Sequence, residues 1–139
     1  MKEKPYELIE HTADVGIRVK AHDLKELFRN AALAMFDIIA EERNLSQKQQ
    51  QVNIQLQAGD REELLITWLN ELLSLSATKA LIFSGFKIIQ LTDTSLNAFV
   101  SGGSIEDYRV NVEIKAATYH QLSVKELGGE WVAEVIFDV

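Results

Sequence analysis

The sequence predicts a single α+β domain in which two main helices pack on antiparallel or mixed sheets. Two segments repeat apolar residues at intervals of three and four, which is typical of a helix with one buried face. The other segments alternate apolar and polar residues, which is typical of half-buried strands. The expected order is β-β-α-β-α-β-β-β-β-β, which lacks the regular strand–helix alternation of a doubly wound parallel sheet.

The amino-terminal region is expected to form two strands joined by a polar turn. The first strand is expected over residues 6–11. The second is expected over residues 15–20, where Val, Ile and Val alternate with Gly, Arg and Lys. The turn His11-Thr12-Ala13-Asp14 therefore places a carboxylate at the start of the second strand.

Both helices are predicted from a capping pattern followed by an apolar stripe. Asp23 and Asp60 are each followed three residues later by a glutamate, Glu26 or Glu63, which is the spacing of a capping box. We expect the two helices to end near residues 39–40 and 78–79. The residues of the two stripes are Leu24, Leu27, Phe28, Ala31, Met35 and Ile38, and Leu64, Leu65, Trp68, Leu69, Leu72 and Leu75.

The segment between the helices is expected to be a loop and a strand. Residues 41–51 are polar and glutamine-rich, and residues 52–56 alternate apolar and polar side chains. After the second helix the pattern changes to strands, expected over residues 81–91, with a bend at Gly85, and over residues 95–101.

The carboxy-terminal third is expected to contain further strands separated by glycine turns. Gly102-Gly103 is predicted to be a turn, and residues 110–114 alternate as a half-exposed strand. Another strand is expected around residues 122–124. Gly128-Gly129 predicts a tight hairpin that leads into a last strand over residues 131–137.

Composition excludes several classes of site and partner. The chain has 139 residues, with 14 Lys and Arg against 21 Asp and Glu, for a net charge of −7. The absence of cysteine excludes disulfides, thiolate metal sites and a cysteine nucleophile. Because phosphate-backbone binding needs a surplus of Lys and Arg, we expect no direct contact with nucleic acid. The sequence shows no signal-peptide pattern and no membrane-spanning stretch, so we expect a cytoplasmic protein without membrane contact.

The residues alone leave the chemistry open. Asp14 and Asp138 are carboxylates at strand ends, a donor type that hard divalent cations prefer. A turn-capping Asp14 and a solvated Asp138 fit the same pattern. Lys115 likewise fits an exposed lysine that discourages edge pairing of a strand. Phosphate-loop, dinucleotide, His-Glu-x-x-His and nucleophile-elbow patterns are all missing.

Motifs spread over the whole chain resemble the archease family. They are Tyr6-Glu7 followed by His11-Thr12-Ala13-Asp14-Val15-Gly16, then Asn30-Ala31-Ala32-Leu33-Ala34-Met35-Phe36-Asp37, Leu64-Leu65 with Trp68-Leu69-Asn70-Glu71-Leu72-Leu73, Glu113-Ile114-Lys115-Ala116-Ala117-Thr118-Tyr119-His120 and Ile136-Phe137-Asp138-Val139. The order and the length also resemble those of the family, so we expect one archease-like domain over residues 1–139.

The resemblance implies a small metal-binding cofactor protein of the GTP-dependent RNA ligase. That ligase joins 2′,3′-cyclic or 3′-phosphate ends to 5′-hydroxyl ends in tRNA splicing and RNA repair. An archease is not itself the ligase, but promotes GMP transfer to it and sustains multiple turnover. By the resemblance, Asp14 and Asp138 are metal ligands, Val139 supplies a terminal oxygen and Lys115 is the activating lysine. The implied cation is calcium, with magnesium or manganese as alternatives.

The resemblance leaves the roles of two matching residues and the mechanism of activation open. His11 and Glu71 match the family without a role being implied for them. The metal cluster either lends a cation to the guanylylation site or reshapes that site through Lys115. Two other functions remain open, a general chaperone of nucleic-acid-modifying enzymes and a hydrolase that uses Asp14 and Asp138 to hold a metal.

Overall fold

In the computed structural model, residues 4–10, 14–43 and 48–139 are described, and they form three antiparallel sheets. The four-stranded sheet has the order β1 (Tyr6–Glu10), β2 (Asp14–Ala21), β9 (Glu130–Asp138), β8 (Ala116–Leu127). The three-stranded sheet has the order β4 (Gln50–Gln57), β6 (Ser95–Ser104), β5 (Leu81–Leu91). The short strands β3 (Ala40–Glu42) and β7 (Tyr108–Val110) form the third sheet, and the one-turn helix η1 (Ile105–Asp107) precedes β7.

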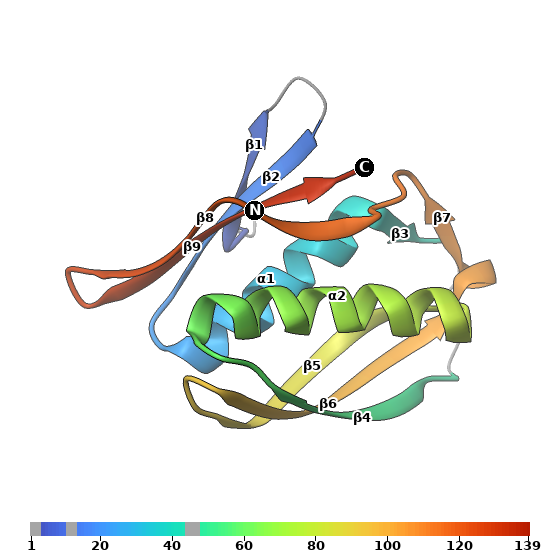
Figure 1. The fold of residues 1–139 in the computed structure, drawn as a ribbon. Coiled ribbons are helices and arrows are strands. Elements are labelled where there is room, and N and C mark those ends of the chain that lie inside the picture. Colours follow the sequence, from blue (N-terminus) through green and yellow to red (C-terminus); the bar gives the residue numbers. More distant parts are fainter. Residues whose placement is uncertain (1–3, 11–13, 44–47) are drawn as a thin grey trace.

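The two helices lie between the larger sheets, as Figure 1 shows. Helix α1 (Leu24–Ile39) contacts β2 on one side and β5 on the other, and α2 (Arg61–Lys79) contacts β8 as well as β5 and β4. A helix covered on two sides buries more than one stripe. This explains why the small residues Ala31, Ala32 and Ala34 of α1 are all fully buried.

The helix starts agree with the predicted caps. The Asp23 and Asp60 carboxylates each accept a hydrogen bond of 2.8 Å from a backbone N–H three residues later. Between the helices, the indole Nε1 of Trp68 donates to the carbonyl oxygen of Phe28 at 3.0 Å. Because both residues are fully buried, this hydrogen bond fixes the crossing point of α1 and α2 inside the core.

The α+β class and both helix ends are confirmed, whereas several details of the strand prediction are wrong. All strand pairs among the described residues are antiparallel, which is the first of the two arrangements expected. The expected loop over residues 41–51 contains part of β3 at its start and part of β4 at its end. The strand expected around residues 122–124 is the second half of β8, which continues through a bulge between Thr118 and Ser123.

Another correction concerns residues 110–114, which are not one strand. Strand β7 ends at Val110. Residues 111–115 then run from the β3–β7 sheet to the four-stranded sheet and do not form a strand themselves. The N–H groups of Asn111 and Val112 both donate to the carbonyl oxygen of Ile39, at 2.8 and 3.3 Å. Ile114 is buried, so the apolar alternation reflects a segment that packs on the core while it connects two sheets.

Glycines mark a hairpin at one position and a close approach of strands at another. Gly128 and Gly129 have φ angles of 60° and 82° and form the predicted turn between β8 and β9. Gly102, predicted to lie in a turn, instead lies inside β6. A Cβ atom on Gly102 would lie 2.8 Å from the carbonyl carbon of Ile82 and 2.9 Å from Cα of Phe83. The glycine is therefore needed because β5 passes so close.

No helix in the described ranges 4–10, 14–43 and 48–139 is long and apolar enough to cross a membrane.

The close approach at Gly102 predicts that Gly102→Ala destabilises the fold. The added methyl group meets backbone atoms that cannot rotate away, and overpacking of this kind costs about 1–3 kcal/mol. Thermal unfolding followed by circular dichroism measures this loss. Gly59→Ala is the matched control, because its Cβ meets only the mobile carboxylate end of Glu63, at 3.1 Å. Equal unfolding temperatures for the two variants would contradict the explanation.

Candidate functional site

The two predicted carboxylates lie directly opposite each other at one end of the four-stranded sheet. Asp14, the first residue of β2, pairs with Asp138, the last residue of β9. Directly opposed residues of an antiparallel pair point to the same face, with Cβ atoms about 4.5–5.5 Å apart. The structure therefore brings together two acids that are far apart in the sequence.

Lys115 lies beside this pair. Its backbone N–H donates to the carbonyl oxygen of Asp138 at 2.8 Å, and the next residue, Ala116, pairs with Asp138 across β8 and β9. Lys115 precedes β8 instead of lying within a strand, and its side chain is exposed. Val139 follows Asp138 and is 36% exposed. The backbones of the four residues implied by the resemblance, Asp14, Lys115, Asp138 and Val139, thus lie next to one another at one end of the sheet.

Asn70 of α2 holds the strand next to Lys115 in place. Its side-chain oxygen accepts from the N–H of Ala117 at 2.8 Å, and its side-chain nitrogen donates to the carbonyl oxygen of Ala117 at 3.1 Å. Because β8 is an edge strand, this amide takes the position that a neighbouring strand would have. Helix α2 therefore fixes the start of β8, and with it the backbone that leads from Lys115.

Asn70 belongs to a motif that matches the family, but the resemblance implies no role for it. Its signal is an asparagine in the middle of a helix, where it is unfavourable unless its side chain has a specific partner. Glu71, the other unassigned residue of this motif, is partly buried on the same helix. His11 and the rest of the turn 11–13 lie outside the described residues.

The charge pattern of this sheet end differs from that of the sheet centre. At the centre, Arg18 bridges Glu7 at 2.9 Å and Glu134 at 2.6 Å, so each acid faces a cation across the strands. Within residues 4–10, 14–43 and 48–139, no salt bridge includes Asp14, Asp138 or Lys115. Like charges placed directly opposite destabilise a sheet. A cation bound between Asp14 and Asp138 would offset this repulsion.

The donors around this pair are oxygen atoms. In the described part of the chain, no three His, Asp or Glu side chains gather into a metal-holding group. A cation would thus use the two facing carboxylates together with main-chain oxygen atoms. This set suits a hard cation such as calcium, which completes its six to eight ligands with carbonyl groups and water.

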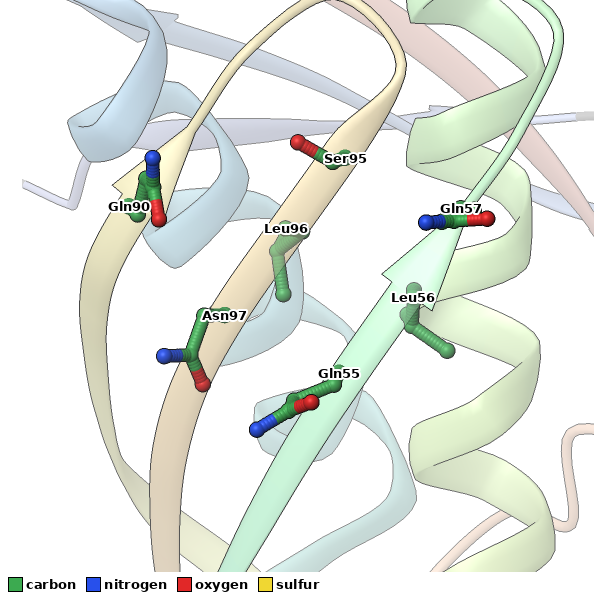
Figure 2. Close-up of a pocket in the computed structure, with 7 residues that line it drawn as sticks. All are labelled: Gln55, Leu56, Gln57, Gln90, Ser95, Leu96 and Asn97. Carbon is green, nitrogen blue, oxygen red and sulfur yellow. The ribbon is translucent and has the colours of Figure 1, made fainter.

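A separate hollow lies on the three-stranded sheet (Figure 2). Its volume is about 550 Å³, and the amide side chains of Gln55, Gln57, Gln90 and Asn97 line much of it. None of its lining residues is ionisable, and it contains none of the predicted site residues. The carboxylate pair thus remains the candidate site.

The chain matches one family model over nearly its whole length. Residues 6–139 match the model described as the archease protein family (MTH1598/TM1083). The archease of Methanosarcina mazei is 35% identical over 142 aligned positions, which cover 98% of this chain and 97% of that relative. The archease of Pyrococcus furiosus is 34% identical, with 98% and 99% covered.

Solved structures have the same fold. The solution structure of protein 1598 of Methanobacterium thermoautotrophicum has a TM-score of 0.73 and 32% identity, and covers 99% of this chain and 100% of its own. The Thermotoga maritima crystal structure, described as an archease and possible chaperone, has a TM-score of 0.66 and 20% identity, with 100% and 98% covered. From the family model and these relatives, the chain belongs to the archease family.

Proposed function

We propose that this protein is a metal-binding cofactor protein that activates the GTP-dependent RNA ligase of tRNA splicing and RNA repair. In this role it promotes GMP transfer to the ligase and sustains multiple turnover. Membership of the archease family points to an accessory protein. The observation that carries the proposal is the pairing of Asp14 with Asp138 beside Lys115.

The cation is held by Asp14, Asp138 and a main-chain oxygen of Val139. The opposed carboxylates supply two hard oxygen donors on one face of the sheet. Calcium suits these donors, and magnesium and manganese use the same donor type. The bound cation supplies positive charge that offsets the repulsion between the two carboxylates. Binding should therefore also stabilise the sheet end formed by β2 and β9.

Lys115 presents a positive charge from a fixed backbone. The hydrogen bond of its N–H to Asp138 and the Asn70 amide on Ala117 hold the chain on both sides of Ala116. The side chain itself is exposed and carries no salt bridge among the described residues. An exposed charge on an anchored backbone is suited to a partner's active site. This favours action on a ligase over catalysis within this chain.

A second candidate function is that of a general chaperone or modulator of nucleic-acid-modifying enzymes. The description of the T. maritima relative as a possible chaperone favours it. The two functions differ in their dependence on the site. Suppression of aggregation for several unrelated enzymes, at equal strength in wild type and Lys115→Ala, would favour the chaperone.

The main test is transfer of labelled GMP from GTP to the cognate ligase, with RNA ends in excess. We expect the wild-type protein to restore guanylylation and multiple turnover. We expect Asp14→Ala, Asp138→Ala and Lys115→Ala to give no more product than the ligase alone, because each removes one side chain of the candidate site.

The matched control for Lys115→Ala is Lys125→Ala, which removes the same charge from an exposed position further along β8. This variant should activate the ligase as the wild type does. If the wild type activates the ligase and the Asp14, Asp138 and Lys115 variants activate it equally well, the proposed site is wrong.

Cation binding can be tested without the ligase by thermal unfolding with calcium or with a chelator. In chelator, Asp14→Asn and Asp138→Asn should each be more stable than wild type, by about 0.2–1 kcal/mol, because one of two opposed charges is removed. In calcium, only the wild type should gain stability. Glu126→Gln removes a charge from an exposed position of the same sheet and should leave the calcium effect unchanged. A calcium gain that persists in the Asn variants would overturn this assignment.

The positioning role of Asn70 predicts a local effect of its substitution. Asn70→Ala removes both hydrogen bonds to Ala117 and should destabilise the fold by about 1–3 kcal/mol. Hydrogen exchange of the Ala117 amide should become faster. Asn70→Asp keeps the side-chain oxygen that accepts from the Ala117 N–H, so this amide should exchange more slowly than in Asn70→Ala. Ligase activation should fall in Asn70→Ala although Lys115 is intact. An unchanged exchange rate at Ala117 would contradict the anchor.

A further inference from the structure

Strand β4 (Gln50–Gln57) has one free edge. It pairs with β6 on one side, and no other strand among the described residues pairs with it. Figure 1 shows β4 at the border of the three-stranded sheet, away from the four-stranded sheet and the candidate site. A free edge presents unpaired backbone N–H and C=O groups, which can accept another strand.

This edge lacks the features with which proteins protect an exposed strand. Residues 49–59 contain no charged residue and no proline, although a quarter of the whole chain is charged. The register of β4 with β6 runs over eight residues without a bulge. Charges, proline and bulges are the usual obstacles to pairing at an edge.

The other free edges of the two larger sheets do carry such obstacles. Strand β1 contains Glu7, and β8 contains charged residues as well as its bulge. Strand β5 contains Lys87 and two register shifts. Among these four edges, β4 alone is uncharged, unbroken and long.

The two faces of β4 differ sharply in chemistry. The apolar residues Val52, Ile54 and Leu56 point to the helices and are buried or partly buried. The residues between them are amides, Gln51, Asn53, Gln55 and Gln57, and all four are exposed.

The amides already bond to one another along the outer face. Asn53 donates to the side-chain oxygen of Asn97 at 2.9 Å, and Gln55 donates to Asn53 at 3.2 Å. Figure 2 shows Gln55 and Asn97 on neighbouring strands, where they are register partners. Since an amide carries both donors and acceptors, this row can extend onto an identical strand.

We propose that β4 pairs antiparallel with β4 of a second copy of this chain, about a two-fold axis at Ile54. This register places Ile54 opposite Ile54 and Val52 opposite Leu56 on the helix side. On the outer side it places Gln51 opposite Gln57 and Asn53 opposite Gln55. Each chain contributes the same strand, as a two-fold interface requires, and the two sheets become one of six strands.

A second copy fits this edge because the strand is complementary to itself. Every apolar residue meets an apolar residue and every amide meets an amide, whereas a shift by one residue would place amides opposite apolar side chains. The net charge of −7 opposes association, but none of it lies on the strand. The dimer should therefore form more strongly at physiological salt than at low salt.

Sedimentation equilibrium from micromolar to millimolar concentration tests the dimer. The wild type should show a reversible monomer–dimer equilibrium. In Gln51→Lys/Gln57→Lys, each lysine faces a lysine of the second copy, so the dissociation constant should rise at least tenfold. In Gln51→Lys/Gln57→Glu, each lysine faces a glutamate, so dimerisation should return. A wild type that stays monomeric, or equal behaviour of the two double variants, would overturn the proposal.

Cysteine cross-linking tests the register. Because the chain has no cysteine, a disulfide can form only at introduced positions. Gln51→Cys mixed with Gln57→Cys should cross-link under mild oxidation, since the two positions face each other. Gln51→Cys alone should not, because its two copies would lie six residues, or about 20 Å, apart along the strands. Equal cross-linking in both samples would overturn the register.

Discussion

Strands β2 and β9 pair over eight residues, and much of the molecule depends on this pairing. Their inward residues, among them Ile17, Val19, Val135 and Phe137, are fully buried and form the surface on which α1 packs. A register shift of one residue would turn these side chains to solvent. The same register determines that Asp14 meets Asp138. The apolar core thus sets the geometry of a polar cluster at the surface, and substitutions in the core will act on the site through β2 and β9.

The two helices transmit this order between the sheets. Helix α1 contacts both larger sheets, and its small alanines allow close approach on two sides. Trp68 connects α2 to α1 through a buried hydrogen bond, and two residues later Asn70 reaches the backbone of β8. One helix therefore anchors the core with one side chain and the candidate site with another. Trp68 and Asn70 are two residues apart, so the core contact and the contact to the candidate site lie within one turn of α2.

Local signals predicted much of the fold, and long-range pairing explains what they missed. Capping aspartates and apolar stripes fixed both helices, because a helix is stabilised by neighbours in sequence. Gly102 was misjudged because glycine marks close backbone approach as well as turns. The strand ends alone made Asp14 and Asp138 candidates, but only the family resemblance linked them to Lys115 and Val139, because the sheet register that brings these residues together is not readable from local patterns. Asn70 was missed because its partner, Ala117, lies 47 residues away.

The pairing of β2 with β9 also bears on how the chain is made and folded. Ribosomes release the amino-terminal strands long before β9 is synthesised, so Asp14 has no partner for most of translation. Until β9 is made, β2 and β8 cannot join one sheet, because β9 lies between them in the finished structure. Contacts of such large sequence separation form late and slow the folding of a domain. The candidate site therefore forms only when the domain is complete, and a chain interrupted before β9 would lack one of the two inner strands of the sheet and the carboxylate pair.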